Sequence, residues 1–98
     1  MDKQRMLDVL FENLKLYHNE KEEDCTWLME DSNFVKSYLL FIEMSNFNED
    51  CIPFFLNNFM TSDFLNHSSK KISCQRILNI FPMLKDKLNP EDMEGYQK

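Results

Sequence analysis

The sequence predicts an all-α fold: a compact bundle of four or five helices with a central antiparallel helix hairpin. Apolar residues recur at steps of three and four in successive segments, which is the spacing of amphipathic helices. The chain has no alanine and its only glycine is Gly95, so the Asn-Gly and Asp-Gly pairs that form tight β-hairpins are absent. Hydrophobic residues make up 43% of the 98 residues, which excludes an intrinsically disordered chain.

The composition also predicts a core of bulky side chains. With nine phenylalanines, seven methionines and no alanine, the helices must cross on large residues, which holds their axes toward the wide end of the roughly 8–10 Å range. Glycine-rich loops that bind phosphate are absent before Gly95. An AT-rich gene is an alternative source of this bias, because Phe, Asn, Lys, Ile and Met have AT-rich codons.

The first helix is predicted over residues 2–17, and Asp2 is its expected N-cap. The charged residues 19–24 interrupt the apolar pattern and are expected to form a loop, followed by a short helical turn over residues 26–30 that packs into the core. The stripe of the first helix consists of Met6, Leu7, Leu10, Phe11, Leu14 and Tyr17. The apolar side chains of the short turn are Trp27, Leu28 and Met29.

Two apolar segments form the predicted central hairpin. Asp31 or Ser32 is expected to cap a helix over residues 33–44, which is apolar around so much of its circumference that we expect it to be buried on several sides. A second helix is predicted to follow a cap at Asn48 and to end near Met60, with Pro53 in its first turn, where a missing N–H does least harm. The connection between them is short and forces antiparallel packing.

A last long helix is predicted over residues 70–88. Pro82 lacks a backbone donor and clashes with the preceding turn, so we expect a kink, or two consecutive helices, with the break near residues 80–82. Residues 1–90 are expected to form one helical domain, and residues 91–98 a mobile polar tail. The stripe of this last helix is Cys74, Ile77, Leu78, Phe81, Leu84 and Leu88.

The order, size and number of these segments suggest several known helical architectures. Consecutive antiparallel helix pairs with a proline early in one helix loosely resemble HEAT or armadillo repeats, and the size and helix count also resemble death-domain-like bundles or small Bcl-2-like modules. The resemblance concerns architecture alone, because no motif of these families occurs in the sequence.

A strand over residues 38–42 is the alternative to a helix in that segment, but no turn residues are present to pair such a strand.

Charge is unevenly distributed along the chain. The formal net charge is −6, with twelve acids and five bases in residues 1–60 and a balance of +1 in residues 61–98. A solvated helix face is the simplest interpretation of the bases in the second part, which we call the basic strip. If the strip binds a partner, the overall acidity favours an acidic protein over nucleic acid. The basic strip consists of Lys70, Lys71, Arg76, Lys85 and Lys87.

No motif predicts catalysis, a metal site or a cofactor. His18 and His67 are the only histidines, and HExxH, paired CxxC, acidic calcium loops and GxSxG are all absent. Cys25, Cys51 and Cys74 are odd in number and widely spaced, which argues for reduced thiols, although a zinc site assembled from these cysteines and the two histidines remains an alternative. There is no apolar signal core or membrane span. We therefore expect a non-enzymatic protein of the cytoplasm or nucleus, with no cofactor, metal or membrane contact.

An excess of aromatic rings predicts the binding surface. Seven phenylalanines fall within the 31 positions 34–64, more than one stripe per helix requires. Phe41, Phe47 and Phe54 lie off the main stripes and are expected to be exposed anchors for a partner helix or peptide. The sequence therefore predicts a protein–protein interaction module, an adaptor or complex subunit, with a homo-oligomer also possible. A nucleic-acid-associated protein that uses the basic strip over residues 70–87 is the alternative.

Overall fold

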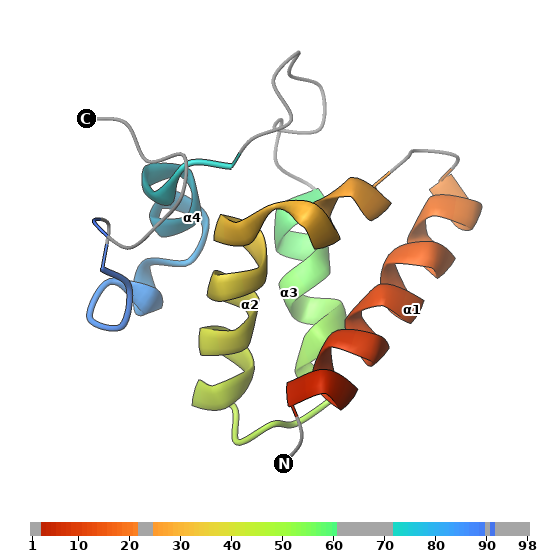
Figure 1. The fold of residues 1–98 in the computed structure, drawn as a ribbon, viewed down its shortest axis with the longest axis horizontal. Helices are drawn as coiled ribbons and strands as arrows, with labels where there is room; N and C mark the ends of the chain where they lie inside the picture. Colours follow the sequence, from red (N-terminus) through yellow and green to blue (C-terminus); the bar gives the residue numbers. More distant parts are fainter. Residues whose placement is uncertain (1–2, 22–24, 61–71, 90, 92–98) are drawn as a thin grey trace.

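The computed structural model of the protein describes residues 3–21, 25–60, 72–89 and 91. Regular structure in these residues is entirely helical, with four α-helices and two short 3-10 helices and no strand (Figure 1). The all-α prediction is confirmed, and the strand alternative at residues 38–42 is wrong because these residues lie within a helix. The expected cap Asp2 and nearly all of the expected tail, residues 92–98, lie outside the described residues.

Helix α1 spans Lys3–Lys21 and is longer than predicted. Its stripe is confirmed in Met6, Leu10 and Leu14, which are fully buried. Residues 19–21 belong to this helix rather than to the expected loop, and residues 22–24 lie outside the described residues. Glu and Lys are good helix formers, and neither proline nor glycine stops the helix there, so a run of charged residues fits an exposed helix end as well as a loop.

The short helix η1 (Thr26–Glu30) leads into α2 (Ser32–Met44), as the sequence predicts. Leu28 of η1 is fully buried, while the neighbouring Trp27 and Met29 are partly buried against the core. The N-cap of α2 is Asp31, whose Oδ1 accepts a hydrogen bond from the backbone N–H of Phe34 at 2.9 Å. One of the two expected caps is therefore confirmed by its geometry.

Without a glycine, the chain leaves α2 through two residues with positive φ. Asn46 has φ 57° and Phe47 has φ 59°, and the N–H of Phe47 donates to the carbonyl oxygen of Ile42 at 2.7 Å. This hydrogen bond and the left-handed Asn46 correspond to a Schellman helix end, with asparagine at the position that glycine usually occupies. The turn reverses the chain and fixes the backbone that carries the Phe47 ring.

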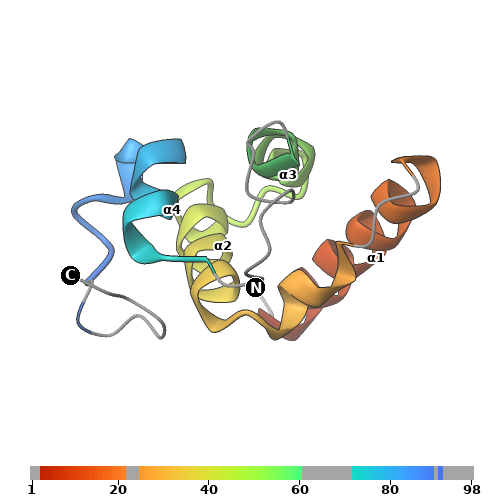
Figure 2. The same cartoon turned by 90° about the horizontal axis from the view of Figure 1, so that it is seen from above.

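Helix α3 (Cys51–Met60) then runs antiparallel to α2 (Figure 1). Asn48 Oδ1 accepts a hydrogen bond from the N–H of Asp50 at 3.0 Å in the turn that precedes α3. Seen from above, α1 and α4 (Cys74–Ile80) lie on opposite sides of α2 (Figure 2). The α2–α3 pair therefore contacts a helix on each side.

The break predicted near Pro82 is confirmed, in the form of two consecutive helices, but these helices cover less than the expected range 70–88, since the first begins at Cys74 and the second ends at Leu84. Helix α4 ends at Ile80, Phe81 has non-helical angles (φ −125°, ψ 74°), and the short helix η3 (Pro82–Leu84) follows. Proline disfavours the α conformation in the residue before it, so the helix ends there. Residues 85–89 continue as turns and irregular chain.

Aromatic rings fill the core where α2, α3 and the α4–η3 segment meet. Phe55 is fully buried, and its ring stacks on Phe81 with centroids 4.8 Å apart and an interplanar angle of 7°. The same ring lies at 5.6 Å from Phe34 and at 5.0 Å from Phe59. Ring-on-ring packing of this kind is the consequence of building a core from phenylalanine without alanine.

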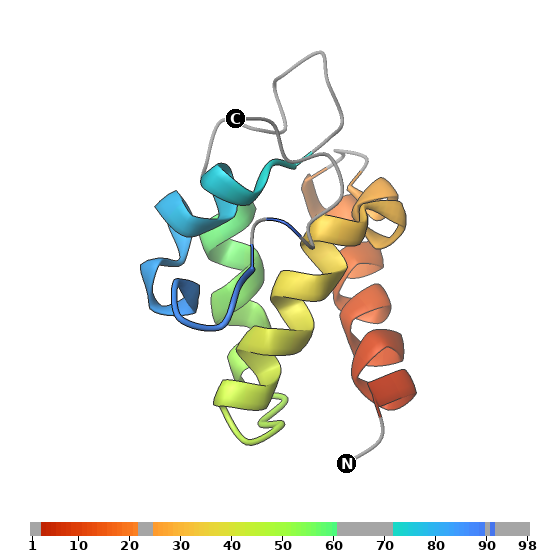
Figure 3. The same cartoon turned by 60° about the vertical axis from the view of Figure 1, so that its left-hand side comes forward.

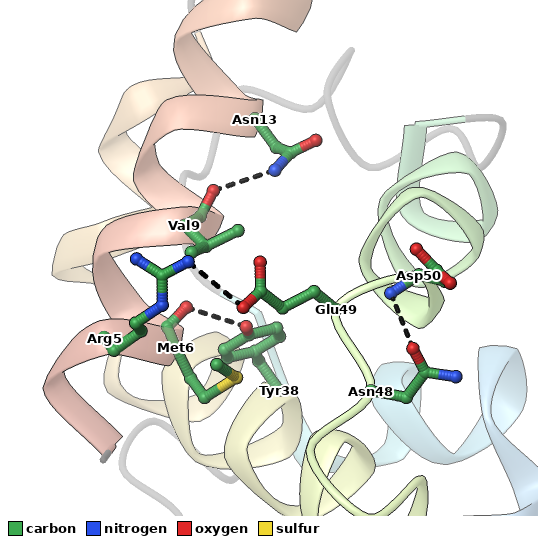
Figure 4. A network of polar contacts seen from close by, with 8 residues as sticks. All are labelled: Arg5, Met6, Val9, Asn13, Tyr38, Asn48, Glu49 and Asp50. Atoms are coloured by element: carbon green, nitrogen blue, oxygen red, sulfur yellow. Dashed lines mark hydrogen bonds and ion pairs between the residues drawn. The ribbon is translucent and has the colours of Figure 1, made fainter. Parts of the chain in front are cut away.

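Polar contacts attach the two flanking segments to the central helices. On one side, the buried hydroxyl of Tyr38 donates to the carbonyl oxygen of Met6 in α1 at 2.8 Å, and nearby Arg5 forms an ion pair with Glu49 at 3.3 Å (Figure 4). On the other side, Asp31 Oδ2 accepts a hydrogen bond from the N–H of Ile72 at 3.0 Å. Burial, and secondarily the Glu49 carboxylate, raise the pKa of Tyr38 well above its usual value.

Candidate functional site

Two of the three predicted anchors form one surface. The rings of Phe41 in α2 and Phe54 in α3 are stacked, with centroids 6.0 Å apart and an interplanar angle of 16°. Phe54 is 55% exposed, as expected, whereas Phe41 is partly buried. We call these two residues the aromatic face. The Phe41 ring therefore packs against one side of the Phe54 ring, while more than half of the Phe54 surface stays accessible.

The position of Phe54 follows from the pattern of α3. Ile52, Phe55, Leu56 and Phe59 are buried at the steps of three, one and three that place them on one side of the helix. Phe54 lies off this stripe and points outward beside the exposed Pro53.

The partial burial of Phe41 differs from the sequence-based expectation of an exposed anchor, and the reason lies in a distant segment. Its ring contacts Phe55 at 5.2 Å and Phe81 at 5.4 Å, and Phe81 follows α4 in the sequence. Met44, three residues further along α2 and 42% exposed, lies on the same side of the helix as Phe41 and adds apolar surface next to it.

Phe47 is also partly buried and lines a pocket of about 260 Å³. The pocket lies on α2, between the start of α1 and the segment that follows η3, which Figure 3 shows on either side of α2. Its apolar floor is formed by Leu39, Leu40, Phe47 and Leu88. Phe47 therefore belongs to a site different from the aromatic face.

The rim of this pocket is mainly basic. Lys3 of α1, Lys36 of α2 and Lys87 line it, together with a single carboxylate, that of Glu43. All four of these residues are exposed. We call the site the lysine-rimmed pocket. In a chain with a formal net charge of −6, three lysines and one glutamate around one pocket make a local excess of positive charge.

The basic strip is described only in part. Lys70 and Lys71 lie outside the described residues, Arg76 is half-buried on α4, and Lys85 and Lys87 are exposed after η3. Of these described residues, Lys87 alone lines the pocket.

Sequence reasoning missed the other two rim lysines. Lys36 was detectable, because it precedes Leu39 and Leu40 by three and four residues and therefore shares their side of α2. Lys3 joins the pocket only through the packing of α1, for which the sequence carries no local signal.

The described residues hold no cluster suited to a metal ion. No group of three or more His, Cys, Asp or Glu residues suited to a metal ion occurs among them, and His67 lies outside them. None of Cys25, Cys51 and Cys74 forms a disulfide, and burial raises the pKa of Cys74, which disfavours its nucleophilic thiolate form. Within the described part of the chain, no helix is long and apolar enough to cross a bilayer.

Comparison with known proteins does not assign the chain. It matches no protein-family model, and it has no significant match among curated proteins or solved structures. The class that the fold defines is an all-helical domain with an aromatic core. The aromatic face and the lysine-rimmed pocket are therefore the candidate binding surfaces of the described residues.

Proposed function

We propose that the protein is a non-catalytic interaction module, an adaptor or complex subunit, that binds an apolar segment of a partner protein through its aromatic face. The observation that carries the proposal is the exposure of Phe54, 55% of whose surface is accessible although its ring stacks on Phe41. A partner helix or peptide in the cytoplasm or nucleus is part of this proposal. The proposal also includes the finer architecture, which is a bundle centred on the helix hairpin and packed like HEAT or armadillo repeats or like a death domain.

The energetics favour Phe54 as the main contact. Covering the exposed part of a phenylalanine ring removes on the order of 100 Å² of apolar surface from water, which contributes about 2–3 kcal/mol. The stack on Phe41 already restricts the rotamers of Phe54, so less side-chain entropy is lost on binding. Aromatic residues with these properties commonly dominate the binding energy of protein interfaces.

The test compares two charge substitutions at exposed apolar positions. Phe54→Glu removes the proposed contact, and Leu16→Glu on α1, where Leu16 is 65% exposed, makes a similar change on another element. We expect both variants to remain folded by circular dichroism. Partners captured by the wild type and by Leu16→Glu, and identified by mass spectrometry, should be lost from Phe54→Glu.

Sedimentation velocity on the wild type and both variants distinguishes a foreign partner from a second copy of the chain. Self-association that Phe54→Glu abolishes would identify the partner as another copy. If Phe54→Glu is folded and retains every partner and every oligomeric state of the wild type, the aromatic face is not the binding surface and the proposal is wrong.

A further inference from the structure

The lysine-rimmed pocket has two features that together define a class of ligand. Its floor is apolar, with Leu39, Leu40 and Phe47 half-buried and Leu88 only 8% exposed. Its volume of about 260 Å³ lies below the roughly 300–1,000 Å³ of pockets that enclose a whole small ligand. The floor therefore suits one large apolar side chain that is inserted from a longer molecule.

The rim selects the charge of that molecule. Lys3, Lys36 and Lys87 face one carboxylate, Glu43, so the lining carries a formal excess of two positive charges. At physiological ionic strength the screening length is about 8 Å, so a ligand within the pocket interacts mainly with this rim and only weakly with the net −6 of the whole chain. Carboxylates next to the inserted side chain complement the rim.

We propose that the lysine-rimmed pocket binds an acidic peptide segment of a partner protein, which inserts one apolar side chain between Leu40, Phe47 and Leu88 and places carboxylates beside the lysines. A nucleic-acid backbone would use the lysines but would leave the apolar floor unfilled. The inference goes beyond the binding proposed for the aromatic face, because neither Phe41 nor Phe54 lines this pocket.

The probes are three labelled peptides of equal length. The first combines glutamates with leucine and phenylalanine, the second has glutamine in place of glutamate, and the third has serine in place of the apolar residues. We expect the first peptide to bind in fluorescence anisotropy and to shift the methyl NMR signals of Leu39, Leu40 and Leu88. The other two should bind on the order of tenfold more weakly, since each lacks one of the two complementary features.

Two lysines near each other provide a matched pair of variants. Lys87 lines the pocket and Lys85 does not, although both are exposed and each charge reversal changes the net charge equally. Lys87→Glu, and likewise Lys3→Glu, should weaken binding of the first peptide on the order of fivefold. Lys85→Glu should leave it unchanged. Equal effects of Lys85→Glu and Lys87→Glu, or equal affinity for the glutamate and glutamine peptides, would overturn the proposal.

Two further measurements test for another ligand of the pocket and for another binding site of the peptide. Decanoate has a carboxylate and an apolar tail, and if it shifts the pocket methyls while the first peptide does not bind, the ligand is a free amphipathic carboxylate and the proposal is wrong. Phe54→Glu should bind the first peptide as the wild type does. If Phe54→Glu abolishes this binding and Lys87→Glu does not, the peptide occupies the aromatic face, which overturns this inference and supports the proposed function.

Discussion

The two sides of the α2–α3 pair are attached to their neighbours in different ways. On the α4 side, Phe81 packs its ring on Phe55 at 4.8 Å and on Phe59 at 5.3 Å. On the α1 side, Met6 is fully buried, and its backbone carbonyl accepts the hydroxyl hydrogen bond of Tyr38 at 2.8 Å. One side therefore depends mainly on contacts between rings, and the other combines aliphatic burial with a buried hydrogen bond and an ion pair.

This difference predicts how each side responds to solution conditions. Ring packing is insensitive to pH and only indirectly sensitive to salt, because no ionisable group takes part. The hydroxyl of Tyr38 titrates at alkaline pH, and the Arg5–Glu49 ion pair is screened by salt. The α1 side is therefore the side on which alkaline pH and ionic strength act first.

The largest expected effect is the loss of the central ring. Phe55→Ala removes a fully buried side chain whose ring contacts Phe34, Phe59 and Phe81, and we expect it to lower the free energy of unfolding by about 3–5 kcal/mol in urea denaturation. The adjacent Phe54 is the control. Because Phe54 is 55% exposed, Phe54→Ala should cost about 1 kcal/mol or less. Equal losses for the two variants would contradict this description of the core.

The next largest effect concerns the polar attachment of the α4 side. Asp31 accepts hydrogen bonds from the N–H groups of Phe34 and Ile72, so Asp31→Ala leaves both donors without this carboxylate and should cost about 1–3 kcal/mol. Asn48→Ala is the control, since Asn48 accepts from one exposed N–H. Hydrogen exchange of the Phe34 and Ile72 amides should accelerate in Asp31→Ala. Unchanged protection of Ile72 would show that this bond does not hold the segment.

Local signals explain which parts of the fold could be predicted. The cap at Asp31 and the break before Pro82 depend on a few neighbouring residues, and both are found. The end of α1 was not predictable, because exposed Asn19 and Glu20 fit a helix end and a loop equally well. The positive φ of Phe47 was not predictable either, since the fold imposes it on a residue type that disfavours it.

The candidate surfaces also differ in whether local sequence signals could predict them. The exposure of Phe54 follows from its place off the stripe of α3, which is a local property. The burial of Phe41 depends on Phe81, 40 positions later, and the rim of the pocket joins Lys3 to Lys87. Contacts between such distant residues are set by how the helices pack and leave no pattern in a single sequence.

On the α1 side, Tyr38→Phe should remove one buried hydrogen bond and lower the free energy of unfolding at pH 7 by about 1 kcal/mol. Burial raises the pKa of Tyr38 in the folded state above its unfolded value of about 10. The stability that depends on the neutral hydroxyl is therefore fully present below pH 10 and is lost as pH rises through the folded pKa. Urea midpoints of the wild type should fall at alkaline pH more than those of Tyr38→Phe, and parallel pH profiles would contradict the assignment.

The smallest effect is expected from the ion pair that joins α1 to the turn before α3. The side chains of Arg5 and Glu49 are 62% and 41% exposed, so Arg5→Gln should cost less than about 1 kcal/mol, and the loss should disappear in concentrated salt. Lys15→Gln is the matched control, because it makes the same change of charge but breaks a pair within α1, that of Lys15 with Glu12 at 3.0 Å. Hydrogen exchange in the first turns of α1 should accelerate in low salt for Arg5→Gln and not for Lys15→Gln. If both variants show the hydrogen exchange of the wild type, the ion pair does not attach α1, and the salt sensitivity inferred for this side is wrong. The buried side chains of α1 and the hydrogen bond of Tyr38 would then hold the helix in place.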